Sequence, residues 1–209
     1  MIYLIGDSAR CGKSTLARQF RAVFDGQVLS GDSTRVAIRE TSRPEWLPDI
    51  FDKLVDATAE DDPPAKRIAR FRRRDMVVWN FLQQYFNSAK FAGDDVLVDG
   101  PLWPSMLANY ELDHRAVFLV DTSENHADRV IQIRDTAEHG NWMKDEKYTD
   151  TTIRKWAKLN VLRSEMMIDE CKKYGYPYFD IAELGLDGSQ QRASEYLSDT
   201  NINSHTYFR

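Results

Sequence analysis

A lysine and two hydroxyl side chains follow a glycine at the start of a predicted helix near the beginning of the chain. The segment is LIGDSARCGKSTLA, residues 4–17, in which a short apolar strand and a loop lead into Gly12-Lys13-Ser14-Thr15. Backbone N–H groups at a helix N-terminus attract anions, and the helix dipole adds to that attraction. A lysine here reaches the β- and γ-phosphates of a nucleotide, and the adjacent hydroxyl can ligate Mg²⁺. The segment therefore predicts a phosphate-binding loop, and its nucleotide-binding residues would be Gly6, Asp7, Ser8, Ala9, Arg10, Cys11, Gly12, Lys13, Ser14 and Thr15.

The predicted loop departs from the usual pattern at one position. Where the first glycine of the pattern is expected this chain has Asp7, and its glycine, Gly6, stands one place early. Aspartate tolerates turn and left-handed geometry better than most residues, so Asp7 can take the first-glycine place; a loop longer by one residue is the alternative. A carboxylate beside phosphates is unfavourable unless a cation faces it. Arg10 or Mg²⁺ would supply that cation.

Two further acids follow other predicted strands. In DDVLVDG, residues 94–100, an apolar strand ends in Asp99, at a position that holds Mg²⁺ in phosphate-loop proteins. In VLSGDSTR, residues 28–35, Asp32 follows the next strand after the phosphate loop, where it can accept the proton of an attacking hydroxyl. Arg35 can clamp an anionic group or a hydroxyl of the substrate. The structural alternatives are an acid that merely ends a strand at Asp99 and a helix cap at Asp32.

Arginines in two segments are candidates for binding phosphate groups. Arg129 lies on a predicted helix and Arg134 follows at its end; both precede a polar loop, and Arg134 is nearer that loop. Such an arginine can close over the phosphates and neutralise developing charge, or it can simply pair with a nearby acid at the surface. The basic segment at residues 66–75 offers Arg70 and Arg73 to a phosphorylated or acidic acceptor, although charge runs are usually solvated faces of helices.

Strands and helices alternate along the chain. Short apolar strands are predicted at residues 2–5, 27–30, 96–98, 116–120 and 176–181, and helices at 13–24, about 47–59, 65–90, 123–133, 151–173 and 189–199. This alternation predicts an α/β fold with a mainly parallel sheet and helices on both faces. Ligands of such sheets bind beyond the carboxyl ends of the strands, where Asp7, Asp32, Asp99 and Asp121 fall. Trp103, just beyond one of these ends, is a candidate for lining a pocket.

The composition limits the class of protein. A chain of 209 residues suits one domain with an inserted lid, and a formal net charge of -5 gives no support for a general nucleic-acid binder. The two cysteines are far apart and lack metal-ligand spacing, which favours the reducing cytoplasm. Met1 leads directly into a strand, so we expect no signal peptide. No apolar run approaches about 18 residues, so we expect no membrane span.

Four segments together resemble the small P-loop kinases, closest to the uridine kinase and nicotinamide riboside kinase group. They are LIGDSARCGKSTLA, LSGDSTR, VLVDGPLW and FLVDTSENHADRVIQIRDTAEHG. The resemblance implies a P-loop NTPase-like three-layer α/β/α fold with a lid and a helical substrate-binding segment. It also implies ATP-dependent phosphorylation of a hydroxyl, with Lys13 and Ser14 holding phosphates and Mg²⁺, Asp32 on the acceptor side, and Arg134 as the lid arginine. Asp7 and residues 40–90 depart from the group's pattern.

The sequence therefore predicts a kinase domain over residues 1–200, a substrate-binding segment at about 40–90, a lid at about 134–150 and a tail at 201–209. The predicted activity is transfer of the γ-phosphoryl group of ATP, with Mg²⁺, to a hydroxyl of a small metabolite, for which a nucleoside is one candidate. One alternative is a nucleoside monophosphate kinase, in which the basic segment binds the acceptor's phosphate. The other is a nucleotide-binding regulatory switch with slow hydrolysis.

Overall fold

A computed structural model describes residues 1–51, 62–111, 113–137, 142–145 and 147–199 of the chain. Within these residues five strands form one parallel sheet in the order β2-β3-β1-β4-β5. The strands are β1 (Ile2–Asp7), β2 (Gln27–Ser30), β3 (Val96–Gly100), β4 (His114–Val120) and β5 (Tyr178–Asp180). The predicted parallel α/β class is confirmed.

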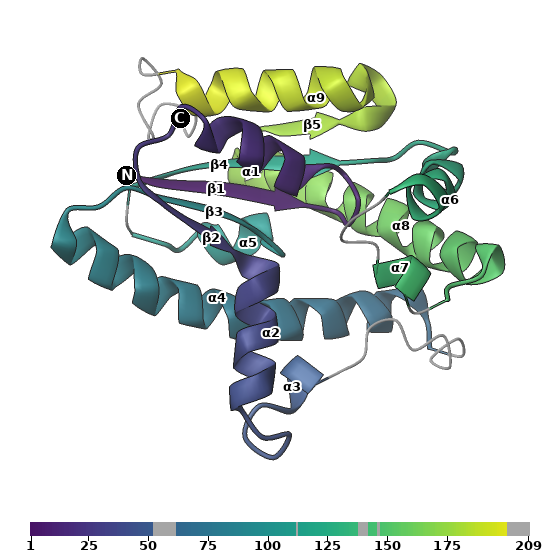
Figure 1. Cartoon of the computed structure of the whole chain (residues 1–209), viewed down its shortest axis with the longest axis horizontal. Helices are drawn as coiled ribbons and strands as arrows, with labels where there is room; N and C mark the ends of the chain where they lie inside the picture. Colours follow the sequence, from purple (N-terminus) through teal and green to yellow (C-terminus); the bar gives the residue numbers. More distant parts are fainter. Residues whose placement is uncertain (52–61, 112, 138–141, 146, 200–209) are drawn as a thin grey trace.

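Helices cover both faces of this sheet. They are α1 (Lys13–Arg21), α2 (Gly31–Thr41), α3 (Pro48–Phe51), α4 (Pro64–Ala92), α5 (Pro104–Leu107), α6 (His126–Thr136), α7 (Trp142–Asp145), α8 (Asp150–Tyr174) and α9 (Ile181–Ser198). Figure 1 shows α1 and α9 over one face and α4, α5 and α8 over the other, which makes three layers. Helices α6 and α7 lie beyond the carboxyl ends of the strands (Figure 1).

The apolar core is divided by the sheet into two parts. On one side Trp79, Leu82 and Phe86 of α4 pack against the central strands. On the other side of the sheet, Leu16 of α1 and Leu197 of α9 pack against the central strands. Because the central strands are covered on both faces, they are apolar at consecutive positions rather than at alternate ones. This explains why they are recognisable in the sequence as short continuous apolar runs.

The structure differs from the sequence-based expectations mainly in its helices. No helix is predicted between residue 24 and about residue 47, but α2 lies there, and its first turn is capped by the Ser30 side chain, which accepts a hydrogen bond from the Ser33 N–H. Of the helix predicted at about 47–59, the described part is α3, and residues 52–61 lie outside the described residues, as does the predicted tail. Helix α9 begins at Ile181 rather than 189, and continues through a bend at Gly185, whose φ is 70°.

Two glycines bring the ends of β2 and β3 close together. A Cβ atom added to Gly31 would lie 2.9 Å from the Cα atom of Gly100, which is too close for a side chain. Ser30 is paired with Asp99 in the sheet register, so the segment that follows β2 begins beside the end of β3. This close approach puts Asp32 and Asp99 at the same edge of the sheet. None of the described helices has the length and apolar content needed to cross a membrane.

Candidate functional site

The loop between β1 and α1 is built on two left-handed residues. Arg10 has a φ of 65° and Gly12, the N-cap of α1, a φ of 86°. A side chain at Gly12 would be strained by that φ, and its Cβ would lie 2.4 Å from the side-chain nitrogen of Gln190 in α9. Gln190 also donates a hydrogen bond of 3.2 Å to the carbonyl of Gly12. Helix α9 therefore packs directly against the loop and helps to hold its shape.

The backbone of Asp7 does not have the left-handed geometry considered from the sequence. It is the last residue of β1, paired with Leu119 of β4, and it is absent from the positive-φ residues. Because its backbone is extended, no left-handed geometry has to be tolerated, and any side chain of suitable size satisfies the backbone. Gly6 is the glycine that close packing requires, since a Cβ there would lie 2.5 Å from the ring of Phe118.

The ammonium group of Lys13 contacts two carboxylates. Its Nζ atom lies 3.1 Å from Oδ2 of Asp32 and 3.6 Å from Oδ1 of Asp7, and only 13% of its side chain is exposed. Burial acts to lower the pKa of Lys13, but the charges of Asp7 and Asp32 outweigh burial and raise it above its ordinary value. Lys13 is therefore positively charged at neutral pH, and it lies where the loop ends and α1 begins.

The two carboxylates beside Lys13 differ in their ionisation. Asp7 is 3% exposed, and burial raises its pKa to about 7 against the opposing charge of Lys13. Asp32 is about half exposed; desolvation acts to raise its pKa, but Lys13 and the nearby arginines lower it below its ordinary value. At neutral pH Asp32 is ionised, whereas Asp7 is close to the midpoint of its titration.

On the other side of the loop, Ser14 and Asp99 form a hydroxyl–carboxylate pair. The Ser14 hydroxyl donates a hydrogen bond of 2.8 Å to Oδ2 of Asp99. One hydroxyl and one carboxylate fit Mg²⁺, which usually takes one or two protein ligands and completes its octahedron with water and phosphate oxygens. Among the described residues no group of three or more histidine, cysteine or acidic side chains is arranged to hold a metal by itself. The pair therefore fits a Mg²⁺ ion that arrives with a nucleotide.

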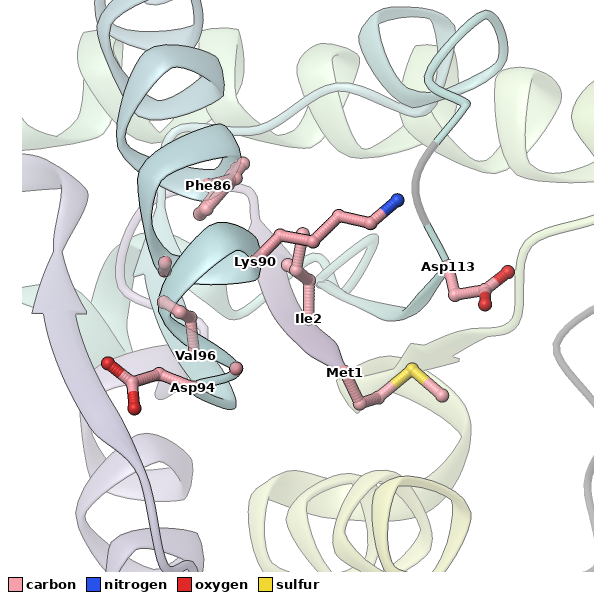
Figure 2. A pocket seen from close by; sticks show the side chains of 9 residues that line it. Met1, Ile2, Phe86, Lys90, Asp94, Val96 and Asp113 are labelled. Atoms are coloured by element: carbon pink, nitrogen blue, oxygen red, sulfur yellow. The ribbon is translucent and has the colours of Figure 1, made fainter.

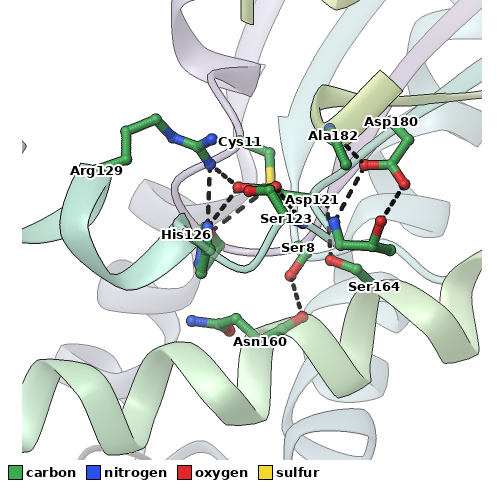
Figure 3. A network of polar contacts seen from close by, with 12 residues as sticks. Ser8, Cys11, Asp121, Ser123, His126, Arg129, Asn160, Ser164, Asp180 and Ala182 are labelled. Atoms are coloured by element: carbon green, nitrogen blue, oxygen red, sulfur yellow. Dashed lines mark hydrogen bonds and ion pairs between the residues drawn. The ribbon is translucent and has the colours of Figure 1, made fainter. Parts of the chain in front are cut away.

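Asp121, the fourth acid at strand ends, is engaged in a network (Figure 3). Its Oδ1 accepts from the N–H and hydroxyl of Ser123, and its Oδ2 contacts His126 Nδ1 at 2.6 Å and the guanidinium of Arg129. Burial lowers the pKa of His126 to about 4, so the imidazole is neutral at pH 7. Asp121 therefore orients Arg129 and the start of α6 and has no oxygen left for a metal.

Arg129 and Arg134 lie in different surroundings. Burial, together with the charge of Asp7, raises the pKa of the Cys11 thiol, and the charge of Arg129 partly opposes this shift. The guanidinium of Arg129 is therefore near the phosphate loop. Arg134 pairs with Asp135 at 2.8 Å and with Asp150 at 2.7 Å, and donates to the carbonyl of Tyr148. Arg134 thus ties the end of α6 to the start of α8 in this structure. Its role as the lid arginine stays a prediction.

Of the predicted substrate-binding arginines, one contacts Asp32 and the other two pair with acids elsewhere. Arg35 lies 3.8 Å from Asp32, within the site. Arg70 pairs with Asp62, and Arg73 pairs with Asp49 at 3.1 Å, so neither has a described contact with Lys13 or Asp32. Their binding of an acceptor phosphate is likewise a prediction.

Trp103 was expected to line a pocket, but its side chain is fully buried. Its indole N–H donates a hydrogen bond of 3.0 Å to Oδ2 of Asp75, which is also fully buried. Asp75 accepts from Arg74 at 2.7 Å and from Arg163 at 3.3 Å. Sequence reasoning missed this arginine cluster, defined as Arg74, Asp75, Trp103 and Arg163. The only signal was the basic segment that contains the first two, and nothing in the spacing indicated Arg163 of α8.

A pocket of about 200 Å³ lies at the amino ends of the strands, at the other end of the sheet from the phosphate loop (Figure 2). Met1, Phe86, Lys90, Asp94 and Asp113 are among the residues that line it. Ligands of parallel sheets bind at the carboxyl ends, so this pocket is separate from the site described above.

Comparison with known proteins supports the fold. The chain is similar to a shikimate kinase from Bacteroides thetaiotaomicron (TM-score 0.56, 13% identity, covering 95% of this chain and 99% of that chain). It is also similar to a shikimate kinase from Acinetobacter baumannii in complex with shikimate (TM-score 0.50, 16% identity, covering 97% of this chain and 94% of that chain). No protein-family model matches the chain, and no curated protein matches its sequence. The three-layer fold of P-loop kinases is confirmed.

Proposed function

We propose that this protein is an ATP-dependent kinase that transfers the γ-phosphoryl group to a hydroxyl of a small metabolite. The observation that carries the proposal is the position of Lys13, which opens α1 behind a left-handed loop glycine and contacts the acceptor-side acid Asp32 at 3.1 Å. Ser14, the next residue, donates a hydrogen bond of 2.8 Å to Asp99, and this pair would hold the metal ion. A phosphate-binding loop, a cation, a metal pair and an acceptor-side carboxylate are the parts that phosphoryl transfer needs.

In the proposed reaction the acceptor oxygen bonds to the γ-phosphorus while the bond from that phosphorus to the oxygen of ADP breaks. The backbone N–H groups of the loop and Lys13 hold the phosphates and neutralise the charge that develops on them. Ser14 and Asp99 would hold Mg²⁺, which neutralises and orients the β- and γ-phosphates when it is bound. These residues therefore act mainly by positioning and by electrostatics.

Asp32 would accept a hydrogen bond from the acceptor hydroxyl and align it. Because its pKa is lowered, it is a weak base, and it would take the proton late, when the hydroxyl oxygen already bonds to phosphorus. The loose transition state of phosphoryl transfer needs little help from a strong base, so a low pKa is compatible with this role. Arg35, at 3.8 Å from Asp32, would keep the carboxylate in place.

We infer that one kinase domain spans residues 1–200, with the substrate-binding segment at about 40–90 and the lid at about 134–150. Trp103 is fully buried and donates a hydrogen bond to Asp75, so in this proposal it does not contact the acceptor directly. The buried, unpaired thiols of Cys11 and Cys171 are compatible with the cytoplasm.

The test is acceptor-dependent release of ADP from Mg·ATP over a panel of hydroxylated metabolites. The panel would contain nucleosides, as the resemblance to uridine and nicotinamide riboside kinases suggests, and nucleoside monophosphates, for the alternative in which Arg70 and Arg73 bind a phosphate. A kinase releases ADP in proportion to the phosphorylated acceptor formed. Slow ADP release that no acceptor stimulates would favour the regulatory switch and would overturn the kinase proposal.

A further inference from the structure

The arginine cluster places more positive than negative charge inside the protein. Arg74 is 8% exposed and Arg163 5%, and the one carboxylate between them is Asp75, which is fully buried. Both oxygens of Asp75 are engaged: Oδ1 accepts from two nitrogens of Arg74, at 2.7 and 3.0 Å, and Oδ2 accepts from Trp103 and Arg163. Within the cluster one guanidinium charge is therefore left without a partner carboxylate, and the acids Asp32 and Asp7, on which the charges of Arg74 and Arg163 act, lie outside the cluster.

Hydrogen-bond donors are left over at the same place. The Nε of Arg163 and the Nε of Arg35 are buried and have no hydrogen-bond partner among the described residues. The Arg163 guanidinium also lies 4.9 Å from the centre of the Trp103 ring, and such stacking fixes the plane of its fork. A fixed, planar donor with spare N–H groups is suited to carboxylate or phosphate oxygens.

The cluster lies next to the acceptor side of the proposed site. The charge of Arg74 helps to lower the pKa of Asp32, and desolvation together with the charge of Arg74 lowers the pKa of Arg35. The charge of Arg163 acts on Asp7, beside Lys13. Trp103, which anchors the cluster, follows Gly100 at the end of β3, and Gly100 abuts Gly31, the neighbour of Asp32. The cluster and the acceptor-side acid therefore share one edge of the sheet.

We propose that Arg74 and Arg163, with Arg35 at their edge, bind an oxyanion carried by the phosphoryl acceptor, so that the acceptor is an anionic hydroxy compound rather than a neutral one. This inference rests on the proposed kinase function for the identity of the ligand as an acceptor. The oxyanion is a carboxylate or a phosphate, since both match the guanidinium fork. Its negative charge would balance the excess cation of the cluster, and its attachment there would orient the hydroxyl toward Asp32.

The test is a binding titration of the full chain loaded with Mg²⁺ and a non-hydrolysable ATP analogue. The probes are two matched sets: glycerol, glycerate and glycerol 3-phosphate, and uridine with uridine monophosphate. We expect a charged member of one set to bind at least about tenfold more tightly than its neutral match, which is about 1.4 kcal/mol. Glycerate against glycerol 3-phosphate distinguishes carboxylate from phosphate. If no charged probe binds more tightly than its neutral match, the proposal is overturned.

Substitutions in the cluster distinguish a role in binding the anion from a role in stabilising the fold alone. Arg163→Lys keeps the charge but loses the planar fork, and Arg35→Gln removes the more exposed guanidinium with less risk to folding. Arg163→Lys should weaken the charged probe about tenfold and leave the neutral probe and the nucleotide analogue unaffected. Arg35→Gln, which also removes a contact with Asp32, should weaken the charged probe about tenfold more than the neutral one. The matched control is Arg154→Gln, on the same helix as Arg163 but at the exposed pair with Asp128. Equal weakening of charged and neutral probes would show that the cluster is only structural.

The outcome also separates this inference from the kinase proposal. Transfer to neutral acceptors without preference for charge would leave the kinase standing and overturn the oxyanion site. Preference for a charged probe, lost in Arg163→Lys, but with no transfer to any acceptor, would support the oxyanion site and overturn the kinase.

Discussion

The Nζ atom of Lys13 lies 3.1 Å from Oδ2 of Asp32, so an ion pair joins the first residue of α1 to the first turn of α2. A phosphate bound in the loop would compete with Asp32 for this ammonium group. The same contact therefore links the nucleotide side of the proposed site to its acceptor side.

Lys13→Ala should lose most ATP-dependent transfer while the protein remains folded. In the proposed reaction the lysine neutralises charge on the transferred phosphoryl group, and losing such a group costs on the order of 100-fold or more in rate. Circular dichroism would verify the fold, and a coupled ADP assay would measure turnover. The matched control is Lys158→Ala, an exposed lysine on α8. Turnover close to that of the unmodified protein would remove the phosphate-loop interpretation.

Asp32→Asn should lower kcat by roughly 100-fold while Mg·ATP still binds. The amide keeps the size of the side chain but loses the charge that, in the proposed reaction, aligns the acceptor hydroxyl and takes its proton. Single-turnover transfer separates this effect on chemistry from an effect on nucleotide binding. If the variant turns over normally, Asp32 serves only in the first turn of α2, and the acceptor contacts lie elsewhere.

Asp99→Asn should fail in a different way, because Asp99 accepts a hydrogen bond of 2.8 Å from Ser14 and this pair is the proposed Mg²⁺ site. We expect the half-saturating Mg²⁺ concentration to rise about tenfold, with part of the rate recovered at high Mg²⁺. The measurement is turnover against Mg²⁺ at fixed ATP, with Asp32→Asn as the comparison. An unchanged Mg²⁺ requirement would argue that Asp99 merely ends β3.

Asp7→Asn should stabilise the protein at alkaline pH and lose that advantage in acid. The pKa of Asp7 is raised from 3.8 to about 7, so the folded state holds its proton more tightly than the unfolded state. Its contribution to stability is therefore complete below pH 3.8 and is lost as the pH rises through 7. At pH 8 we expect the variant to be more stable by on the order of 2 kcal/mol.

Urea unfolding of both proteins at pH 5 and pH 8 measures this difference. Lys13 retains Asp32 as a partner in the variant, so loss of the weaker 3.6 Å contact with Asp7 should not mask the effect. A difference in free energy of unfolding that is the same at both pH values would show that Asp7 does not titrate with a raised pKa.

Asp75→Asn should destabilise the fold strongly. The carboxylate is fully buried and accepts from Arg74, Trp103 and Arg163, so its neutralisation leaves two buried guanidinium groups without a counter-charge. The expected cost is about 3–5 kcal/mol in the free energy of unfolding, measured in urea. Asp128→Asn, at an exposed ion pair with Arg154, should change stability by less than about 1 kcal/mol.

The sequence by itself determined the elements whose signals are local. The phosphate loop, the apolar central strands and the long helices α4 and α8 are recognisable because an apolar run, a helical period or a loop lysine needs only neighbouring residues. The acids at the strand ends are predictable too, since parallel strands bring their carboxyl ends to one edge. Helix α2 was missed because its start depends on a cap from Ser30, in a short segment with little apolar periodicity.

Only the tertiary structure decided which of these side chains meet. Asp32 meets Lys13, whereas Asp121, at a similar strand end, is engaged by Ser123, His126 and Arg129. Arg163 joins Asp75 because α8 packs beside α4, at a separation of 88 residues that no local pattern encodes. The physical reason is that charge, burial and hydrogen bonding act through space, so a side chain's chemistry depends on the elements packed around it.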